Sequence, residues 1–211
     1  MTTPSGDAAD ANATSRRDTA GPEYTQRLSR LEGTAWKRVI NAQAPYRWNV
    51  RRMNLGFTLD VGCGIGRNLS HLDGKGIGVD HNPDSIATVR NKGYIGFTID
   101  EFFASEYAAA DTFDSILVAH VVEHMPEADA ISMVGSYLPF VKAAGQVVFI
   151  TPQERGYASD TTHVRFVDFQ ALSDLAASLD LHVQRQYSFP LPRWAGKAFV
   201  YNEFVCTTRV P

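Results

Sequence analysis

The chain has 211 residues, of which 44% are hydrophobic, and its formal net charge is −3. This length suits one well-packed domain and is short for two, and the slight negative charge argues against a nucleic acid as the main partner. The two cysteines, Cys63 and Cys206, provide neither a disulfide framework nor a metal-ligand spacing. We therefore expect a cytoplasmic protein without a metal ion.

Residues 1–22 are rich in Ala, Thr, Asp and Ser and almost lack large apolar side chains. This composition predicts a disordered tail. No apolar segment follows Arg16-Arg17, which argues against a signal peptide, and no apolar run is long enough to cross a membrane. We predict a single domain over residues 23–211 that begins with a helical lid at about 23–53.

From Phe57 onward, strand and helix patterns alternate, which predicts a parallel α/β sheet covered on both faces. The Pro-rich connection at 189–197 leaves no room for a helix, so the last two strands should pair antiparallel. The predicted strands are 57–61, 76–80, 94–98, 113–118, 145–151, 181–188 and 199–208. The predicted helices are 66–73, 83–92, 127–141 and 168–179.

A glycine-rich turn follows the first of these strands. Gly62, Gly64 and Gly66 stand at alternate positions, where a tight turn and the close approach of a ligand to the backbone require glycine. The next strand ends in Asp80, twenty residues after Asp60, the spacing at which nucleotide-binding units place a carboxylate on ribose hydroxyls. An adenosine-containing ligand is the first hypothesis.

The spacing of the turn distinguishes between adenosine ligands. The dinucleotide fingerprint is G-x-G-x-x-G, but here the third glycine comes one residue early and an acid precedes the turn. Asp60 would repel a pyrophosphate and suits an ammonium or sulfonium group. The segment Asp60-Val-Gly-Cys-Gly-Ile-Gly66 resembles motif I of the class I S-adenosylmethionine-dependent methyltransferases, within their type 11-like small-molecule group.

This resemblance implies a Rossmann-like, seven-stranded, mostly parallel sheet in the order 3-2-1-4-5-7-6, with the last strand antiparallel. It also implies S-adenosyl-L-methionine as the cofactor. Asp100 would accept from the adenine amino group, although it could equally cap the next helix. The predicted cofactor-binding residues are Asp60, Gly62, Cys63, Gly64, Gly66, Asp80, His81, Asn82, Asp100, Glu101, Phe102, Ala119 and His120.

The fourth strand leads into Ala119-His-Val-Val-Glu-His124, which resembles motif IV of the same small-molecule group. Members of that group with many different substrates have similar residues after this strand, so Glu123 and His124 are interpreted as supporting the fold or the cofactor. His120 stands at the strand end itself and is a candidate catalytic residue.

The fifth strand opens into a polar loop with Asp160 and His163. These two residues could form an oriented base, or they could simply hold the loop together. Two ligands of mixed type do not make a metal site, so no metal is predicted. His163 is the second catalytic candidate, and both residues are also candidate substrate contacts.

Topology places the loop after the sixth strand beside the acceptor if that strand is parallel to the first five. Arg193 and Trp194 in this loop, together with Trp36, Tyr46 and Trp48 in the lid, are therefore predicted substrate-binding residues. Aromatic faces with interspersed cations suit a sugar.

The function predicted from these features is O-methylation of a hydroxyl group on a small polar acceptor, such as a saccharide or glycan precursor. Other acceptors left open are a carboxylate, a phenol or another small metabolite. An NAD(P)-dependent oxidoreductase and a non-catalytic cofactor-binding module are alternatives of other classes. We expect a monomer or homodimer with no nucleic-acid or membrane partner.

Overall fold

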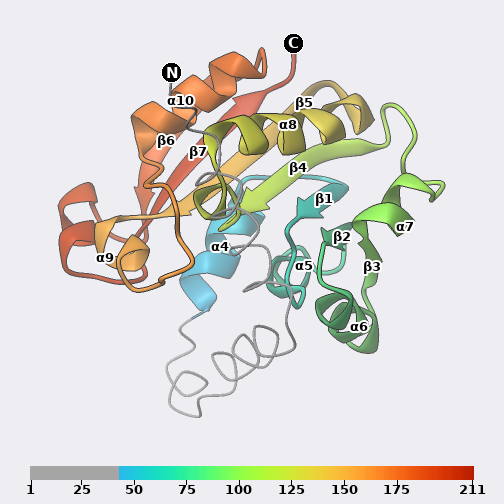
Figure 1. Cartoon of the computed structure of the whole chain (residues 1–211), viewed down its shortest axis with the longest axis horizontal. Helices are drawn as coiled ribbons and strands as arrows, with labels where there is room; N and C mark the ends of the chain where they lie inside the picture. The colour runs from blue at the N-terminus through green and yellow to red at the C-terminus, as the bar shows by residue number, and fades with distance from the viewer. Residues whose placement is uncertain (1–42) are drawn as a thin grey trace, which may run out of the picture.

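The structure, a computed structural model, describes residues 43–211. Seven strands in this part of the chain form one sheet in the order β3-β2-β1-β4-β5-β7-β6 (Figure 1). They are β1 (Thr58–Val61), β2 (Gly76–Asp80), β3 (Ile95–Thr98), β4 (Phe113–Ala119), β5 (Val141–Pro152), β6 (His182–Phe189) and β7 (Glu203–Arg209). The first five strands run parallel, and β7 runs antiparallel to β5 and β6. The predicted sheet is confirmed. The predicted tail, Trp36 and most of the predicted lid lie outside the described residues.

Helices cover both faces of this sheet (Figure 1). Helices α7 (Ile99–Phe103), α8 (Glu127–Tyr137) and α10 (Phe169–Ser178) contribute to the core on one face. Helices α4 (Ala44–Arg52), α5 (Arg67–His71) and α6 (Pro83–Asn91) pack on the other. The predicted two-sided arrangement is therefore confirmed.

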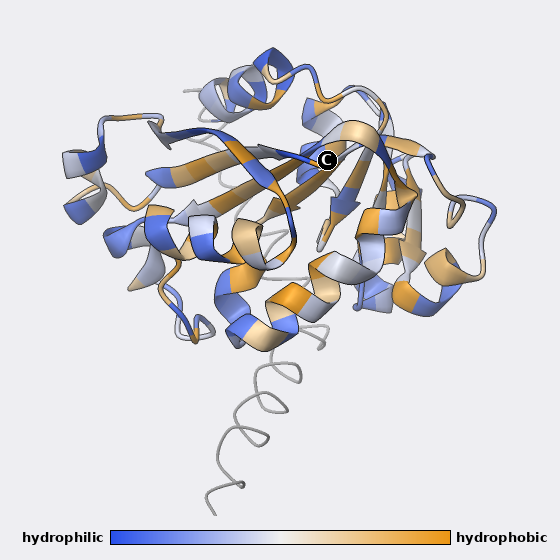
Figure 2. Ribbon diagram, turned by 90° about the horizontal axis from the view of Figure 1, so that it is seen from above, coloured by the Kyte–Doolittle hydropathy of each residue, from blue (hydrophilic) through white to orange (hydrophobic). Residues whose placement is uncertain are grey.

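The central strands β4 and β5 alternate their side chains between the two faces, as extended chains must. Ile116 and Val118 of β4 join the core under α8 and α10, whereas Leu117 contacts the core that includes Val50 of α4. All of these side chains are almost fully buried, and each contributes about 1.5–3 kcal/mol by leaving water. Figure 2 shows the resulting apolar band along the strands in the middle of the sheet.

Several short helices were not predicted. Helices α7 and α9 (Glu154–Tyr157) have five and four residues, too few to show a helical period in the sequence. The connection between β6 and β7 contains a 3₁₀ helix, η3 (Arg193–Lys197), so the prediction that it had no room for a helix was wrong. The antiparallel pairing predicted from that connection still holds.

Two strand boundaries also differ from the prediction. β5 begins at Val141 rather than at residue 145, after the 3₁₀ helix η2 (Leu138–Phe140). β7 begins at Glu203 rather than at residue 199, because the chain between η3 and β7 folds into a turn. A further 3₁₀ helix, η1 (Val122–His124), follows β4.

None of the helices between residues 43 and 211 is both long and apolar enough to cross a bilayer.

Candidate active site

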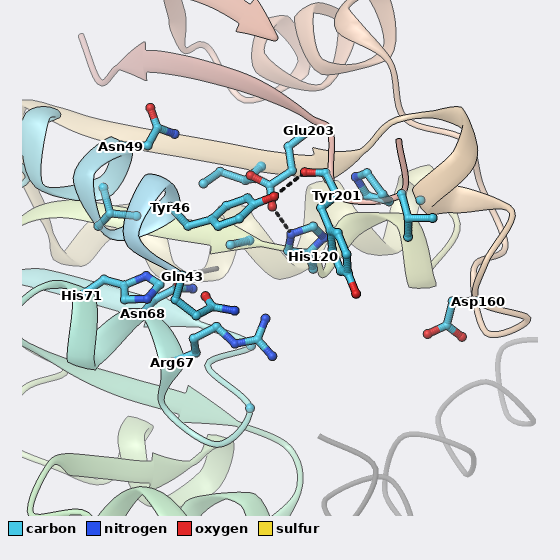
Figure 3. A pocket seen from close by; sticks show the side chains of 18 of the residues that line it. Gln43, Tyr46, Asn49, Arg67, Asn68, His71, His120, Asp160, Tyr201 and Glu203 are labelled. Carbon is cyan, nitrogen blue, oxygen red and sulfur yellow. Dashed lines mark hydrogen bonds and ion pairs between the residues drawn. The ribbon is translucent and has the colours of Figure 1, made fainter. Parts of the chain in front are cut away.

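A cavity of about 320 Å³ opens at the carboxyl ends of β1, β4 and β5. Ligands of open parallel α/β sheets bind at this edge, and the volume lies within the range of about 300–1,000 Å³ that is usual for small-molecule sites. Figure 3 shows side chains converging on it from α4, from α5 and from the loop before β7. The lining includes Gln43, Tyr46, Asn49, Gly62, Cys63, Gly64, Arg67, Asn68, His71, Ala119, His120, His124, Asp160, His163, Tyr201, Asn202 and Glu203.

The glycine turn forms the floor of this cavity. Gly62 has φ +72° and Gly66 has φ +81°, a left-handed conformation that other residues rarely adopt. A Cβ atom on Gly62 would lie 2.3 Å from Cγ2 of Val121, so even alanine does not fit there. The backbone N–H of Gly64 donates to Oδ2 of Asp80 at 2.8 Å, which joins the turn to the end of β2.

Asp60 lies beneath the turn and is fully buried. Its Oδ1 accepts a hydrogen bond from Nδ2 of Asn68 at 3.3 Å, and its Oδ2 has no hydrogen-bond partner in the described part of the chain. Burial raises the pKa of Asp60 to about 7, helped by the negative charge of Asp80 and opposed by the Asn68 hydrogen bond. A cation brought into this site would favour the ionised carboxylate.

The end of β2 carries three of the predicted residues. Asp80 is nearly buried, and its Oδ1 accepts from the backbone N–H of Asn82 at 2.9 Å. The Asn82 side chain accepts from Asp84 N and Ser85 N and so caps α6. The ring of His81 lies half-exposed, with Nδ1 3.4 Å from Oδ1 of Asp80.

The residues after β3 begin helix α7 rather than an open loop. Thr98 and Glu101 form a capping box at its N-terminus, and Glu101 also pairs with Arg90 at 2.7 Å. Asp100 is exposed in the first turn of the helix. Phe102 is fully buried in the core beneath α8, whereas Ile99 in the first turn of the helix is exposed.

His120 stands at the end of β4 between two carboxylates. Its Nε2 contacts Oε1 of Glu203 at 2.9 Å, and its Nδ1 lies 3.4 Å from Oε1 of Glu123. Burial disfavours the charged ring, but the two carboxylates outweigh it and raise the pKa of His120 to about 10. The two carboxylates therefore favour the charged form of His120. Its backbone has φ +59°, which turns the ring at the strand end into the cavity (Figure 3).

The loop after β5 presents His163 to the cavity. Its Nδ1 contacts the carbonyl oxygen of Tyr157 at 2.7 Å, and the two rings stack 5.3 Å apart. Oδ1 of Asp160 accepts hydrogen bonds from N and Oγ1 of Thr162. The acceptor that orients the His163 ring is thus a main-chain carbonyl, rather than the Asp160 carboxylate that the sequence suggested.

Helix α4 closes one side of the cavity. The hydroxyl of Tyr46 donates to the carbonyl oxygen of Tyr201 at 2.6 Å and so bridges α4 to the loop before β7 (Figure 3). Trp48, in contrast, is exposed and stacks on Phe189 away from the cavity lining.

The two predicted residues of η3 also lie outside the lining. Arg193 forms a bidentate pair with Glu154 at 2.8 and 2.6 Å, and Trp194 is 75% exposed. It is the chain after η3 that reaches the cavity, through Tyr201, Asn202 and Glu203.

Sequence reasoning did not find several lining residues. Glu203 is the first residue of β7 and falls within a predicted strand, while Arg67, Asn68 and His71 lie on the helix after the glycine turn. Burial, together with the charges of Arg67, Arg47 and Arg51, lowers the pKa of His71 to about 4, so this ring is neutral at pH 7.

Comparison with known proteins agrees with this geometry. Residues 58–145 match the family described as methyltransferase domain. Together with the sheet order, this match indicates a methyltransferase domain that uses S-adenosylmethionine. No curated protein matches it by sequence.

Solved structures of similar fold share little sequence with this chain. Magnesium protoporphyrin IX methyltransferase from Synechocystis PCC 6803, with bound S-adenosylmethionine, has a TM-score of 0.65 at 11% identity, covering 98% of this chain and 100% of that one. The 1,6-didemethyltoxoflavin-N1-methyltransferase of Burkholderia thailandensis has a TM-score of 0.65 at 15% identity, with coverages of 100% and 93%. A SAM-dependent methyltransferase from Archaeoglobus fulgidus has a TM-score of 0.61 at 18% identity, with coverages of 78% and 92%.

The cofactor of this class is S-adenosyl-L-methionine, and the glycine turn fits it. The unpaired Oδ2 of buried Asp60 gains a counter-charge from a cationic ligand, and the backbone at Gly62 and Gly64 allows close approach. Asp80 retains acceptor capacity for ribose hydroxyls, because each of its oxygens accepts a single backbone hydrogen bond.

Proposed function

We propose that this methyltransferase transfers the methyl group to a hydroxyl oxygen of a small polar acceptor, such as a saccharide or glycan precursor. The observation that carries the proposal is the group of polar side chains in the cavity beside the glycine turn. Two imidazoles and a carboxylate, from His120, His163 and Glu203, meet there. Such groups suit an acceptor with several hydroxyls, which needs many hydrogen-bond partners.

Methyl transfer to an alcohol requires removal of its proton. The methyl carbon leaves the sulfonium sulfur as the acceptor oxygen bonds to it, so the sulfonium becomes a neutral thioether and the hydroxyl proton must pass to a base. His163 is the better of the two predicted candidates. The Tyr157 carbonyl can only accept a hydrogen bond, which fixes the proton on Nδ1 of His163 and the basic lone pair on Nε2.

His120 suits a different task. The carboxylates of Glu123 and Glu203 flank its ring and favour the charged form, which has no lone pair to accept a proton. We propose that it donates a hydrogen bond that positions the acceptor or the cofactor, and that Glu203 fixes its orientation.

Around the reaction centre, we propose that the chain excludes water and aligns the reactants, which supplies much of the rate enhancement in a displacement of this kind. The bridge between Tyr46 and Tyr201 closes one wall. Helix α4 then forms the last part of the predicted lid. Trp48, Arg193 and Trp194 would contact only a longer acceptor that extends beyond the cavity.

The proposal is tested with S-adenosylmethionine and a panel of saccharides, phenols and carboxylic acids, with products identified by mass spectrometry. Mild alkali then distinguishes the bond formed, because it cleaves a methyl ester and leaves a methyl ether intact. The proposal requires an alkali-stable methyl product from a saccharide. Exclusive formation of esters or phenyl ethers would overturn it.

The assignment of the base is tested with His163→Ala and the matched control His182→Ala, which alters an exposed histidine on β6. Loss of a general base lowers turnover by about 10²–10⁴-fold, whereas affinity for S-adenosylhomocysteine should stay within a few-fold of wild type. Equal loss of turnover and cofactor affinity in His163→Ala would reject this role.

A further inference from the structure

The end of β4 and the loop after β5 bring three potential metal ligands together outside the glycine turn. Glu123 and His124 belong to η1, and His163 follows α9. One ligand atom from each residue lies within 4.8 Å of the other two. A tetrahedral zinc ion holds its ligands at about 2.0–2.2 Å, and so about 3.3 Å from one another. Small side-chain rotations would therefore complete the site.

The two histidine rings are oriented as in protein metal sites. Nδ1 of His124 contacts the carbonyl oxygen of Thr162 at 3.2 Å, and Nδ1 of His163 contacts that of Tyr157 at 2.7 Å. Nδ1 of His124 also lies 3.1 Å from Oγ1 of Thr162, but this hydroxyl donates its proton to Asp160. Because a carbonyl oxygen only accepts, each ring carries its proton on Nδ1 and its lone pair on Nε2. Ligating histidines usually donate their other ring N–H to such an acceptor. The ring centroids lie 4.7 Å apart.

Glu123 supplies the second, independent observation. Its side chain is fully buried, and neither carboxylate oxygen has a hydrogen-bond partner in the described residues. Its nearest printed cation is the His120 ring, with Nδ1 3.4 Å from Oε1. A buried carboxylate normally has its lone pairs satisfied. This single ion pair leaves most of the acceptor capacity of Glu123 unused.

The backbone holds this cluster in place. The N–H groups of Val164 and Arg165 both donate to the carbonyl oxygen of Glu123, at 2.9 and 3.1 Å. These bonds tie the loop that bears His163 to the helix that bears the other two ligands. His124 and His163 also line the cavity, so a metal ion bound here would have an open side toward a ligand.

We propose that Glu123, His124 and His163 form a binding site for a divalent transition-metal ion, with zinc as the representative ion. Two imidazole nitrogens and one carboxylate suit zinc and its neighbours in the first transition row. They do not suit magnesium, which prefers oxygen ligands in an octahedron. Three protein ligands with an open position are typical of catalytic rather than structural zinc sites.

A metal ion here would change the proposed chemistry, a consequence that rests on the proposed O-methylation. Nε2 of His163 would then be a ligand rather than the base. The acceptor hydroxyl would bind at the open position and lose its proton to solvent more readily, as metal-bound water does. The resulting oxygen would form the bond to the methyl carbon as the carbon–sulfur bond breaks.

Metal binding is measured on untagged, chelator-treated protein by calorimetric titration with Zn²⁺, with Mg²⁺ as the comparison, and by the visible spectrum of bound Co²⁺. We expect one zinc per chain, intense Co²⁺ bands typical of four-coordination, and much weaker binding of Mg²⁺. Glu123→Gln and His163→Gln should each weaken zinc binding by more than the roughly 10–100-fold that loss of an outer-shell partner costs.

His182→Gln serves as the control, because this exposed histidine on β6 lies outside the cluster. Since Glu123 also faces His120, circular dichroism confirms that each variant is folded, and His163→Gln provides an independent test from the loop. The proposal is overturned if wild-type protein binds no zinc, or if folded His163→Gln binds it as tightly as His182→Gln. Both measurements are independent of turnover, so failure of the saccharide assay does not decide this question.

Discussion

Replacement of Asp60 by Asn should stabilise the ligand-free protein while weakening cofactor binding. The carboxyl is fully buried, and its pKa rises from 3.8 to about 7 because burial disfavours the charge. The folded protein therefore holds this proton more tightly than the unfolded chain, so stability falls as pH rises from about 4 to about 7. At 1.36 kcal/mol per pKa unit, a shift of about three units corresponds to about 4 kcal/mol at pH 8.

Urea denaturation of ligand-free protein at pH 5 and pH 8 measures this effect. Asp60→Asn removes the cost of ionisation, so the gain in free energy of unfolding over wild type should be up to about 4 kcal/mol at pH 8 and much smaller at pH 5. Asp111→Asn makes the same chemical change at an exposed position and should leave the pH dependence unchanged. A gain of equal size at both pH values, or a loss at pH 8, would refute the reasoning.

Three further substitutions test other parts of the site. Gly62→Ala should lower the free energy of unfolding by about 2–4 kcal/mol and abolish binding of S-adenosylhomocysteine, because it adds a clash with Val121 to backbone strain. The control Gly93→Ala alters a glycine with φ +82° and no atom within 4 Å of an added Cβ, so it should show the effect of strain alone. Equal losses of stability for the two variants in urea denaturation would contradict the clash. Glu203→Gln should lower the pKa of His120, because it removes one of the two flanking carboxylates, and NMR titration of the ring measures this pKa. Glu154→Gln should leave the pKa of His120 unchanged, because Glu154 pairs with Arg193. A His120 titration that Glu203→Gln does not alter would count against the assignment. Asn82→Ala should lower the free energy of unfolding by about 1 kcal/mol, because it removes the N-terminal cap of α6. Asn91→Ala, at the exposed end of the same helix, should lower it by less. Equal losses for the two variants would show that the cap is not the cause.

Much of the fold could be predicted because its signals are local. Alternation of apolar strands with helical segments predicts a parallel sheet. The glycines at alternate positions predict the tight turn after β1, where Gly62, Gly64 and Gly66 all have positive φ. The short helices α7 and α9 could not be predicted in this way. Their existence depends on caps and neighbours rather than on a repeating apolar pattern.

Some residues of the candidate site could likewise be predicted from the sequence, and others could not. Asp60 and Asp80 could be found because their spacing from the glycines is fixed by chain geometry. Glu203 could not, since its approach to His120 spans 83 positions and depends on how β7 pairs with β5. Trp48 and Trp194 were predicted to bind the substrate because aromatic side chains suit a sugar. Both are exposed outside the cavity lining, because packing against Phe189 and the turn of η3 set the directions of their side chains.

The most direct test of the account is a crystal structure of the protein with S-adenosylhomocysteine. The account predicts the amino-acid tail of the ligand at the turn of Gly62 and Gly64, its ribose on Asp80, and its sulfur facing the cavity that His120 and His163 line. A ligand bound elsewhere, or one whose ammonium lies away from Asp60, would contradict it.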